Sequence, residues 1–239
     1  MRHATSKFQL KTLGLFIAMM WASFPLVGQQ VQSLNLPRYD QRQWHFGFIL
    51  GSQMMEFNYR SDVIWPEGVY GVEVIQQPGY NVGIVTNLHL GETADLRFVP
   101  TYSAGERTLL FDAIDPSDSI RKNISRRIES SLIVFPLELK LKTERIGNHR
   151  WYVLGGAYAA LDLASKAKVV DDRIFKLQPA DYGFEVALGI DMYFEYFKFS
   201  PQYRFTFGQG NISVPDGTPF ANALPMVNTR FHGIVLTFE

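Results

Sequence analysis

The sequence has no cysteine and no excess of charge of either sign. Without cysteine, disulfides and thiolate metal sites are excluded. The chain has 23 basic and 23 acidic residues, and removal of residues 1–28, which hold Arg2, Lys7 and Lys11 but no acid, would leave an acidic excess of three. So small an imbalance gives no electrostatic basis for nucleic-acid binding. After residue 28 no apolar run is long enough for a transmembrane helix.

The first 28 residues have the pattern of an export signal. A basic start precedes the apolar run LGLFIAMMWASFPLVG, and Gly28 followed by Gln29 and Gln30 is the expected cleavage point. The run is shorter than the ~20 residues of a spanning helix, and Pro25 interrupts it. We therefore expect residues 1–28 to be a cleaved signal peptide, with an uncleaved anchor as the alternative. The lack of cysteine excludes a lipid-anchored lipoprotein.

Eight later stretches alternate apolar residues with small or polar ones. A period of two predicts strands whose two faces differ in character. The expected strands cover residues 44–59, 80–90, 94–105, 130–142, 150–163, 181–194, 197–208 and 230–239. We expect a barrel domain over residues 44–239, preceded by a lead-in over residues 29–43.

The connections between these stretches alternate in length. The long ones cover about residues 60–79, 105–129, 164–180 and 208–227, and the others are short. This alternation is typical of an outer-membrane barrel with short periplasmic turns and long extracellular loops. It predicts that both termini are periplasmic.

The first strand raises the question of which face is inside. Trp44, Phe46 and Phe48 share one face, and the other face carries His45 and Gly47. A lipocalin-like soluble barrel would place the aromatic face inward and cover its outside with Lys and Glu. Here the less apolar faces hold mainly Gly, Ala, Ser and Asn, which suit a narrow lumen. We therefore predict an all-β, eight-stranded antiparallel up-and-down transmembrane β-barrel with aromatic residues toward lipid and no aqueous pore.

Some positions do not fit a regular strand. Pro100, Pro136 and Pro201 argue against regular pairing where they occur, because proline has no N–H for the ladder. The stretch 150–163 is compatible with either phase. These points stay open at the level of sequence.

The inward faces of the later strands carry opposite charges. Paired acids can act as general acid and base, but charges in a narrow interior of low dielectric must be paired, which favours a salt-bridge network. The expected lumen network comprises Glu138, Lys140, Asp181, Glu185, Asp191, Lys198 and Arg204. His45, His89 and His232 have no metal-site spacing, and we expect neither a metal nor a cofactor.

Two segments outside the strands are candidates for binding a partner. The second long loop carries a basic patch that can bind lipopolysaccharide phosphates or be a solvated face. The lead-in just before the first strand either contacts a partner or plugs the barrel mouth. The basic patch comprises Arg121, Lys122, Arg126 and Arg127, and the candidate contact in the lead-in comprises Arg38, Tyr39 and Asp40.

NLPRYDQRQWHFGFILGSQMMEF, residues 35–57, resembles the start of the PorT (SprT) family. FPLELKLK, EVALGIDMYF and KFSPQYRFTFG are similar to later strands of that family and of its wider superfamily. The resemblance implies an integral outer-membrane component of the type IX (Por) secretion system of Bacteroidota, which exports proteins with C-terminal sorting domains and, in gliding species, adhesins for motility. The family has no established catalytic residues. The chain end FHGIVLTF resembles the signal that barrel-assembly machinery recognises, with Glu239 one residue beyond it.

The function expected from these features is non-enzymatic. The leading hypothesis is a barrel that helps assemble or stabilise the type IX translocon, with translocon subunits and outer-membrane lipids as partners. The alternative is a surface adhesion or lipopolysaccharide-binding barrel that acts through its long loops. An outer-membrane enzyme such as a lipid acylase is the third hypothesis, but the sequence offers no convincing Ser, His and acid set, no Gly-rich phosphate loop and no HExxH motif.

Overall fold

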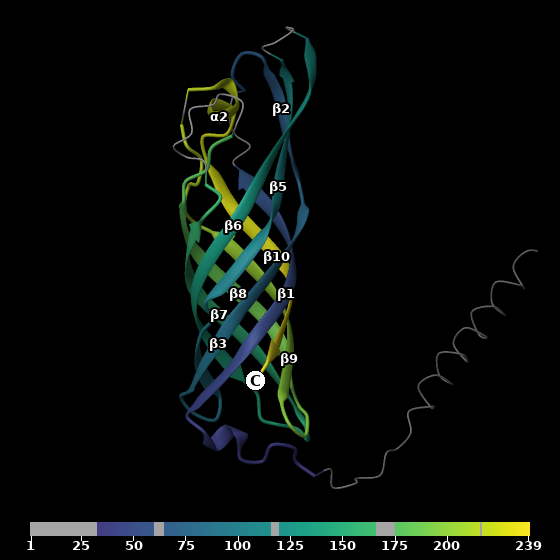
Figure 1. Cartoon of the computed structure of the whole chain (residues 1–239), viewed down its shortest axis with the longest axis vertical. Coiled ribbons are helices and arrows are strands. Elements are labelled where there is room, and N and C mark those ends of the chain that lie inside the picture. The colour runs from purple at the N-terminus through teal and green to yellow at the C-terminus, as the bar shows by residue number, and fades with distance from the viewer. Residues whose placement is uncertain (1–32, 60–64, 116–119, 166–174, 216) are drawn as a thin grey trace, which may run out of the picture. The chain divides into compact units, whose positions relative to one another are not determined.

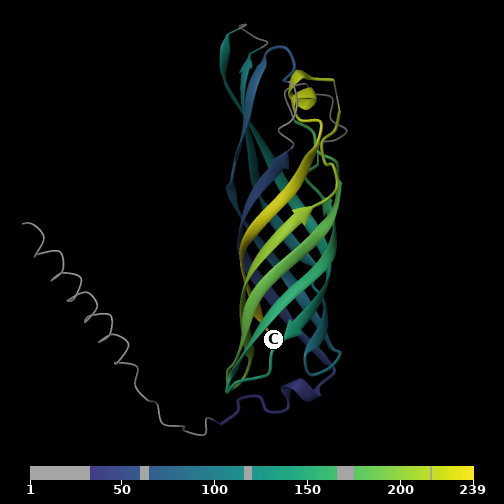
Figure 2. The same ribbon diagram turned by 180° about the vertical axis from the view of Figure 1, so that it is seen from behind.

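Residues with a period of two form long, tilted antiparallel strands, which Figures 1 and 2 show from opposite sides. The computed structural model describes residues 33–59, 65–115, 120–165, 175–215 and 217–239. The predicted signal peptide, residues 1–28, lies outside these ranges. Residues Leu34–Glu239 cluster as one unit.

Strands make up most of this unit. They are β1 (Trp44–Tyr59), β2 (Val69–Ile75), β3 (Gln77–His89), β4 (Ala94–Phe98), β5 (Thr101–Ile114), β6 (Arg121–Lys142), β7 (His149–Asp162), β8 (Ala180–Tyr193), β9 (Lys198–Gly208) and β10 (Val227–Phe238). The helices are short: η1 (Tyr39–Gln41) lies in the lead-in and α2 (Pro219–Ala223) in the last connection. No helix in the described ranges is long and apolar enough to cross a membrane.

The strands close into a ring. The order is β1-β10-β9-β8-β7-β6-β4-β3, and β1 pairs with β3 to complete the circle. β4 and β5 occupy one position, because both pair with β3 on one side and β6 on the other. The ring therefore has eight positions, all antiparallel, and the predicted fold class is confirmed.

The aromatic face of the strands is on the outside. In β1, Phe46 is 67% exposed whereas Ile49 is 1% exposed, and β3, β8 and β9 show the same alternation. In β7, whose phase the sequence left open, Trp151 and Val153 face outward and Tyr152 and Leu154 are buried.

Two of the prolines coincide with breaks in the strand ladders. Pro100 separates β4 from β5, opposite the part of β6 that contains Pro136. Pro201 lies where the β8–β9 register skips Ile190 and Asp191. Because proline donates no backbone hydrogen bond, these local breaks are the physical cost of placing it in a sheet.

The two ends of the barrel differ. At the short-turn end, residues 90–93, 143–148 and 194–197 connect neighbouring strands. The lead-in and the C-terminus lie at this end, at the bottom of Figure 1.

At the other end, the long-loop end, the strands reach further than predicted. Residues 105–129 were expected to be a loop, but β5 extends to Ile114 and β6 begins at Arg121. The first expected loop contains β2, which pairs with β5. β2 with residues 108–114 of β5 and 121–127 of β6 forms a three-stranded arm above the ring (Figure 1). The prediction of a loop was wrong because cross-strand pairing, which period alone does not reveal, extends both strands.

An apolar cluster packs against the arm at the long-loop end. It joins side chains of the arm to the segment that carries α2, so the arm does not stand unsupported in solvent. The cluster consists of Phe57, Val69, Leu109, Phe111, Ala113, Phe175, Leu177, Ile212, Phe220, Ala223, Leu224 and Val227.

Close approach of β6 and β7 generates a prediction about two adjacent glycines. A Cβ at inward-facing Gly156 would overlap the backbone of Leu137 and Glu138, whereas a Cβ at Gly155 would meet only the Glu185 oxygen at 4.0 Å. We expect Gly156→Ala to lower the free energy of unfolding by about 1–3 kcal/mol. Gly155→Ala is the matched control and should leave stability unchanged or slightly higher. Urea unfolding in detergent micelles, followed by tryptophan fluorescence, measures both, and equal stability of the two variants would contradict the expected close approach.

Candidate functional site

The lumen is filled by charged side chains from several strands. Alternate residues of each strand point inward, so ionisable groups at those positions meet in a narrow space with little water. The seven residues expected there are all buried, each no more than 8% exposed. They are Glu138 and Lys140 on β6, Asp181, Glu185 and Asp191 on β8, and Lys198 and Arg204 on β9.

Arg204 organises the middle of the lumen. Its guanidinium lies 2.8 Å from Glu138 Oε1 and donates to Glu185 Oε2 at 3.0 Å. Thr206 donates a further hydrogen bond to Glu185 Oε1 at 2.9 Å. Two carboxylates thus share one guanidinium, which keeps acids on different strands close together without leaving either unpaired.

A second group lies nearer the short-turn end. Lys140 Nζ donates to both oxygens of Asp191, at 2.7 and 2.9 Å, and Ser200 donates to the same carboxylate at 2.6 Å. Lys140 Nζ also lies 3.7 Å from the ring centroid of Tyr152. The ammonium is therefore held between a carboxylate and an aromatic face.

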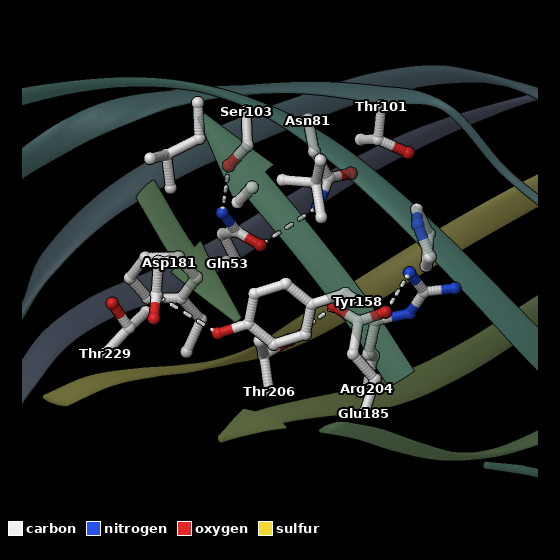
Figure 3. A pocket seen from close by; sticks show the side chains of 15 residues that line it. Gln53, Asn81, Thr101, Ser103, Tyr158, Asp181, Glu185, Arg204, Thr206 and Thr229 are labelled. Carbon is white, nitrogen blue, oxygen red and sulfur yellow. Dashed lines mark hydrogen bonds and ion pairs between the residues drawn. The ribbon is translucent and has the colours of Figure 1, made fainter. Parts of the chain in front are cut away.

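Asp181 belongs to neither group. It accepts a hydrogen bond from Tyr158 Oη at 3.2 Å and from the backbone N–H of Tyr182 at 2.8 Å. It lines a small cavity beside Arg204 and Glu185, which Figure 3 shows with Gln53 and Asn81 on the opposite wall. The cavity volume is about 30 Å³, which is room for a few water molecules.

Several charged lumen residues were not predicted. Lys142 Nζ donates to Asp95 Oδ1 at 2.6 Å, and Arg107 lies 3.6 Å from Asp162. Arg97 is 1% exposed and donates to Glu239 Oε1 at 3.3 Å. Asp95 and Arg97 precede the break at Pro100, and Arg107 falls in the segment expected to be a loop. Asp95 and Arg97 alternate with Leu96 and Phe98, and this alternation is the sequence signal that could have identified both as lumen residues.

Glu239, which lies one residue beyond the predicted C-terminal signal, joins the final strand to the lumen. Its carboxylate pairs with Lys198 as well as with Arg97, and its side chain is 1% exposed. The backbones of Glu239 and Lys198 also exchange two hydrogen bonds, at 2.7 and 3.0 Å. Glu239, although it lies outside the predicted signal, is therefore the acid that joins the cations at the short-turn mouth.

The lead-in closes this mouth. Tyr39 Oη donates to Glu239 Oε2 at 2.7 Å, and the Tyr39 ring stacks on His45 with 4.0 Å between centroids. Lys198 Nζ lies 4.5 Å from the Tyr39 centroid. Burial raises the pKa of the Tyr39 hydroxyl well above its usual range, so at neutral pH the group keeps its proton and remains a donor.

Further contacts hold the lead-in on both sides of Tyr39. Asp40 accepts from both terminal nitrogens of Arg150, at 3.1 and 3.3 Å. Asn35 contacts the β6–β7 turn, since its N–H donates to Asn148 Oδ1 at 2.9 Å. Of the three predicted partner-contact residues, Tyr39 and Asp40 face the barrel, whereas Arg38 is exposed.

The remaining candidate residues do not assemble into a reactive centre. His45 is buried against the Tyr39 carbonyl and His89 pairs with Asp95, whereas His232 faces outward and contacts Tyr203. Among the described residues, no group of three or more His, Cys, Asp or Glu side chains is arranged to hold a metal ion.

Comparison with known proteins identifies a protein family that matches most of the chain. The family model described as "Outer membrane protein beta-barrel domain" matches residues 29–214. No curated protein matches the chain in sequence.

Solved structures give similar barrels at low identity. OprG from Pseudomonas aeruginosa has a TM-score of 0.44 and 13% identity, covering 82% of this chain and 91% of that one. Neisserial surface protein A has a TM-score of 0.43 and 10% identity, covering 82% and 97%. Ail of Yersinia pestis, solved with the heparin analogue sucrose octasulfate, has a TM-score of 0.39 and 8% identity, covering 82% and 99%.

The docking of the lead-in generates a prediction. Tyr39→Phe removes the donor to Glu239 but keeps the ring, so the lead-in should detach more often from the mouth. We expect trypsin to cleave after Arg42 roughly tenfold faster than in the wild type, because cleavage follows the population of the open form. The rate is measured by mass spectrometry of the detergent-purified protein.

Gln41→Ala is the control for that experiment, since Gln41 lies in the same helix and its side chain is exposed. The barrel itself should remain intact in both variants, as judged by its heat-dependent migration on gels. Equal cleavage rates for Tyr39→Phe and wild type would show that the hydroxyl does not hold the lead-in in place.

Proposed function

Because this chain belongs to the family of outer-membrane proteins with a β-barrel domain, we propose that it acts in the outer membrane as a closed, non-enzymatic scaffold. The observation that carries the proposal is the filled lumen. Paired charges occupy its middle, and the lead-in lies across its short-turn mouth. The cavity beside Arg204, at about 30 Å³, has room for no more than a few water molecules.

The scaffold is proposed to serve the type IX secretion system. The segment that resembles the PorT family, residues 35–57, includes the lead-in residues that close the mouth as well as most of β1. In this proposal both termini are periplasmic, which follows the usual placement of short turns in such barrels. The lead-in then meets the periplasm with Arg38 exposed, where it can help assemble or stabilise the translocon.

The arm favours a second candidate function. β2 and the extended parts of β5 and β6 stand beyond the ring and are supported by the apolar cluster. A rigid projection at the long-loop end suits adhesion to another surface. Replacement of the arm residues with a short turn would abolish adhesion but leave secretion intact if this candidate holds.

The secretion role is tested by deletion of the gene in its host. We expect type IX cargo to accumulate in the periplasm, and complementation with the intact protein to restore it to the medium. Complementation with Arg38→Glu should restore secretion only partly, because the exposed cation of the lead-in is reversed in charge. Quantitative immunoblots of periplasm and medium measure both, and normal secretion in the deletion strain would contradict the role.

The closed lumen has its own test. In planar bilayers the purified protein should give no stable single-channel steps, because paired charges and the lead-in fill the path. A variant that lacks residues 29–43 should also fail to conduct, since Arg204 and its carboxylate partners still block the middle. Stable, ion-selective steps from the wild type would refute the scaffold proposal but would leave a secretion role open.

A further inference from the structure

The outer wall of the barrel carries polar side chains where lipid-facing strands are otherwise apolar. Toward the long-loop end, Arg230 and His232 point outward from β10, and Tyr203 points outward from the neighbouring β9. From His232 toward the short-turn end, the outward residues of β10 are Ile234, Leu236 and Phe238. The polar group therefore lies at the border of the apolar belt, where head groups of the membrane begin.

Tyr203 forms a hydrogen bond with His232. The Tyr203 hydroxyl and His232 Nδ1 are 2.7 Å apart, and the two ring centroids are 6.1 Å apart. With the phenol as donor, the imidazole accepts at Nδ1 and carries its proton on Nε2. No described residue accepts a hydrogen bond from Nε2, so in this tautomer its N–H is a donor on the outer wall.

Arg230 is the second donor on this face. Its side chain is 47% exposed, and its ion pair with Glu56 is long, 4.0 Å from Nε to Oε1. Glu56 already accepts a hydrogen bond from Gln76 at 2.6 Å. The positive charge of Arg230 is therefore only weakly compensated by the protein, beside the Phe207 ring at 5.9 Å.

The predicted basic patch differs from Arg230 in this respect. Arg121 donates to both oxygens of Asp112, at 2.9 and 2.5 Å, and Lys122 lies 2.6 Å from Asp115. The Arg126 guanidinium lies 4.8 Å from the Phe220 centroid, inside the support of the arm. These three of its four cations are engaged within the arm itself, which leaves them less suited to bind an external anion.

We propose that Arg230 and His232 form a site for the phosphate of an outer-leaflet glycolipid, lipid A. Residues two apart on one strand face are about 7 Å apart, a separation that a single phosphate can bridge with two of its oxygens. Arg230 supplies a charge-assisted contact and His232 a ring N–H. The site does not depend on a secretion role. It depends on the long-loop end facing outward. A negative result for lipid binding therefore does not contradict the secretion role, and a negative result for cargo export does not contradict the lipid site.

The test uses native mass spectrometry of the full chain in detergent with added lipid A. We expect Arg230→Gln to lower the affinity for bisphosphorylated lipid A about tenfold and His232→Ala to lower it by a smaller factor. Arg42→Gln removes the same charge from an exposed position at the short-turn end and should bind as the wild type does. Heat-dependent gel migration shows that each variant is folded.

Lipids that lack the proposed recognition group provide the decisive comparison. Dephosphorylated lipid A should bind wild type and Arg230→Gln equally weakly. Equal affinity of the wild type for the phosphorylated and dephosphorylated forms would overturn the site. Equal affinity for phosphatidylglycerol would overturn the assignment to lipid A, and unchanged binding by both Arg230→Gln and His232→Ala would overturn the residues.

Discussion

Charged side chains inside a narrow barrel must be paired, and this requirement determines how the strands and the lead-in are joined. An ion taken out of water must find a partner, and removal of one partner of a buried pair costs about 3–5 kcal/mol. Arg204 meets this requirement for Glu138 and Glu185 together, and Lys140 meets it for Asp191. Because each side chain is held by others from different strands, the lumen cannot open or rearrange locally without leaving a charge unpaired.

The same constraint couples the two ends of the chain. Glu239 belongs to the end of the last strand, and its carboxylate is the acceptor for Tyr39 of the lead-in. Lys198 and Arg97 hold that carboxylate in place only when β9, β10 and β4 have taken their positions in the ring. The lead-in can therefore dock fully only on a closed barrel. Closure of the mouth requires the last strand to be in place.

The sequence predicts those strands whose own alternation of apolar and polar residues is regular. The bounds of β1 and the inward positions of Glu185 and Asp191 follow from a strict period of two. Arg97 and Glu239 were missed because their contact joins residues 142 positions apart, and spacing carries no information about that pairing. The arm was missed for a related reason: β5 and β6 stabilise one another by register, which the sequence of either segment alone does not reveal.

The closed mouth also limits how the lead-in can bind a partner. Tyr39 and Asp40 already donate to or accept from the barrel, so a partner that uses them has to replace the contacts with Glu239 and Arg150. Breaking the first leaves a buried carboxylate with fewer donors, which opposes release. A partner that uses exposed Arg38 meets no such opposition. Binding through Arg38 therefore leaves the barrel closed, whereas binding through Tyr39 must be strong enough to open its mouth.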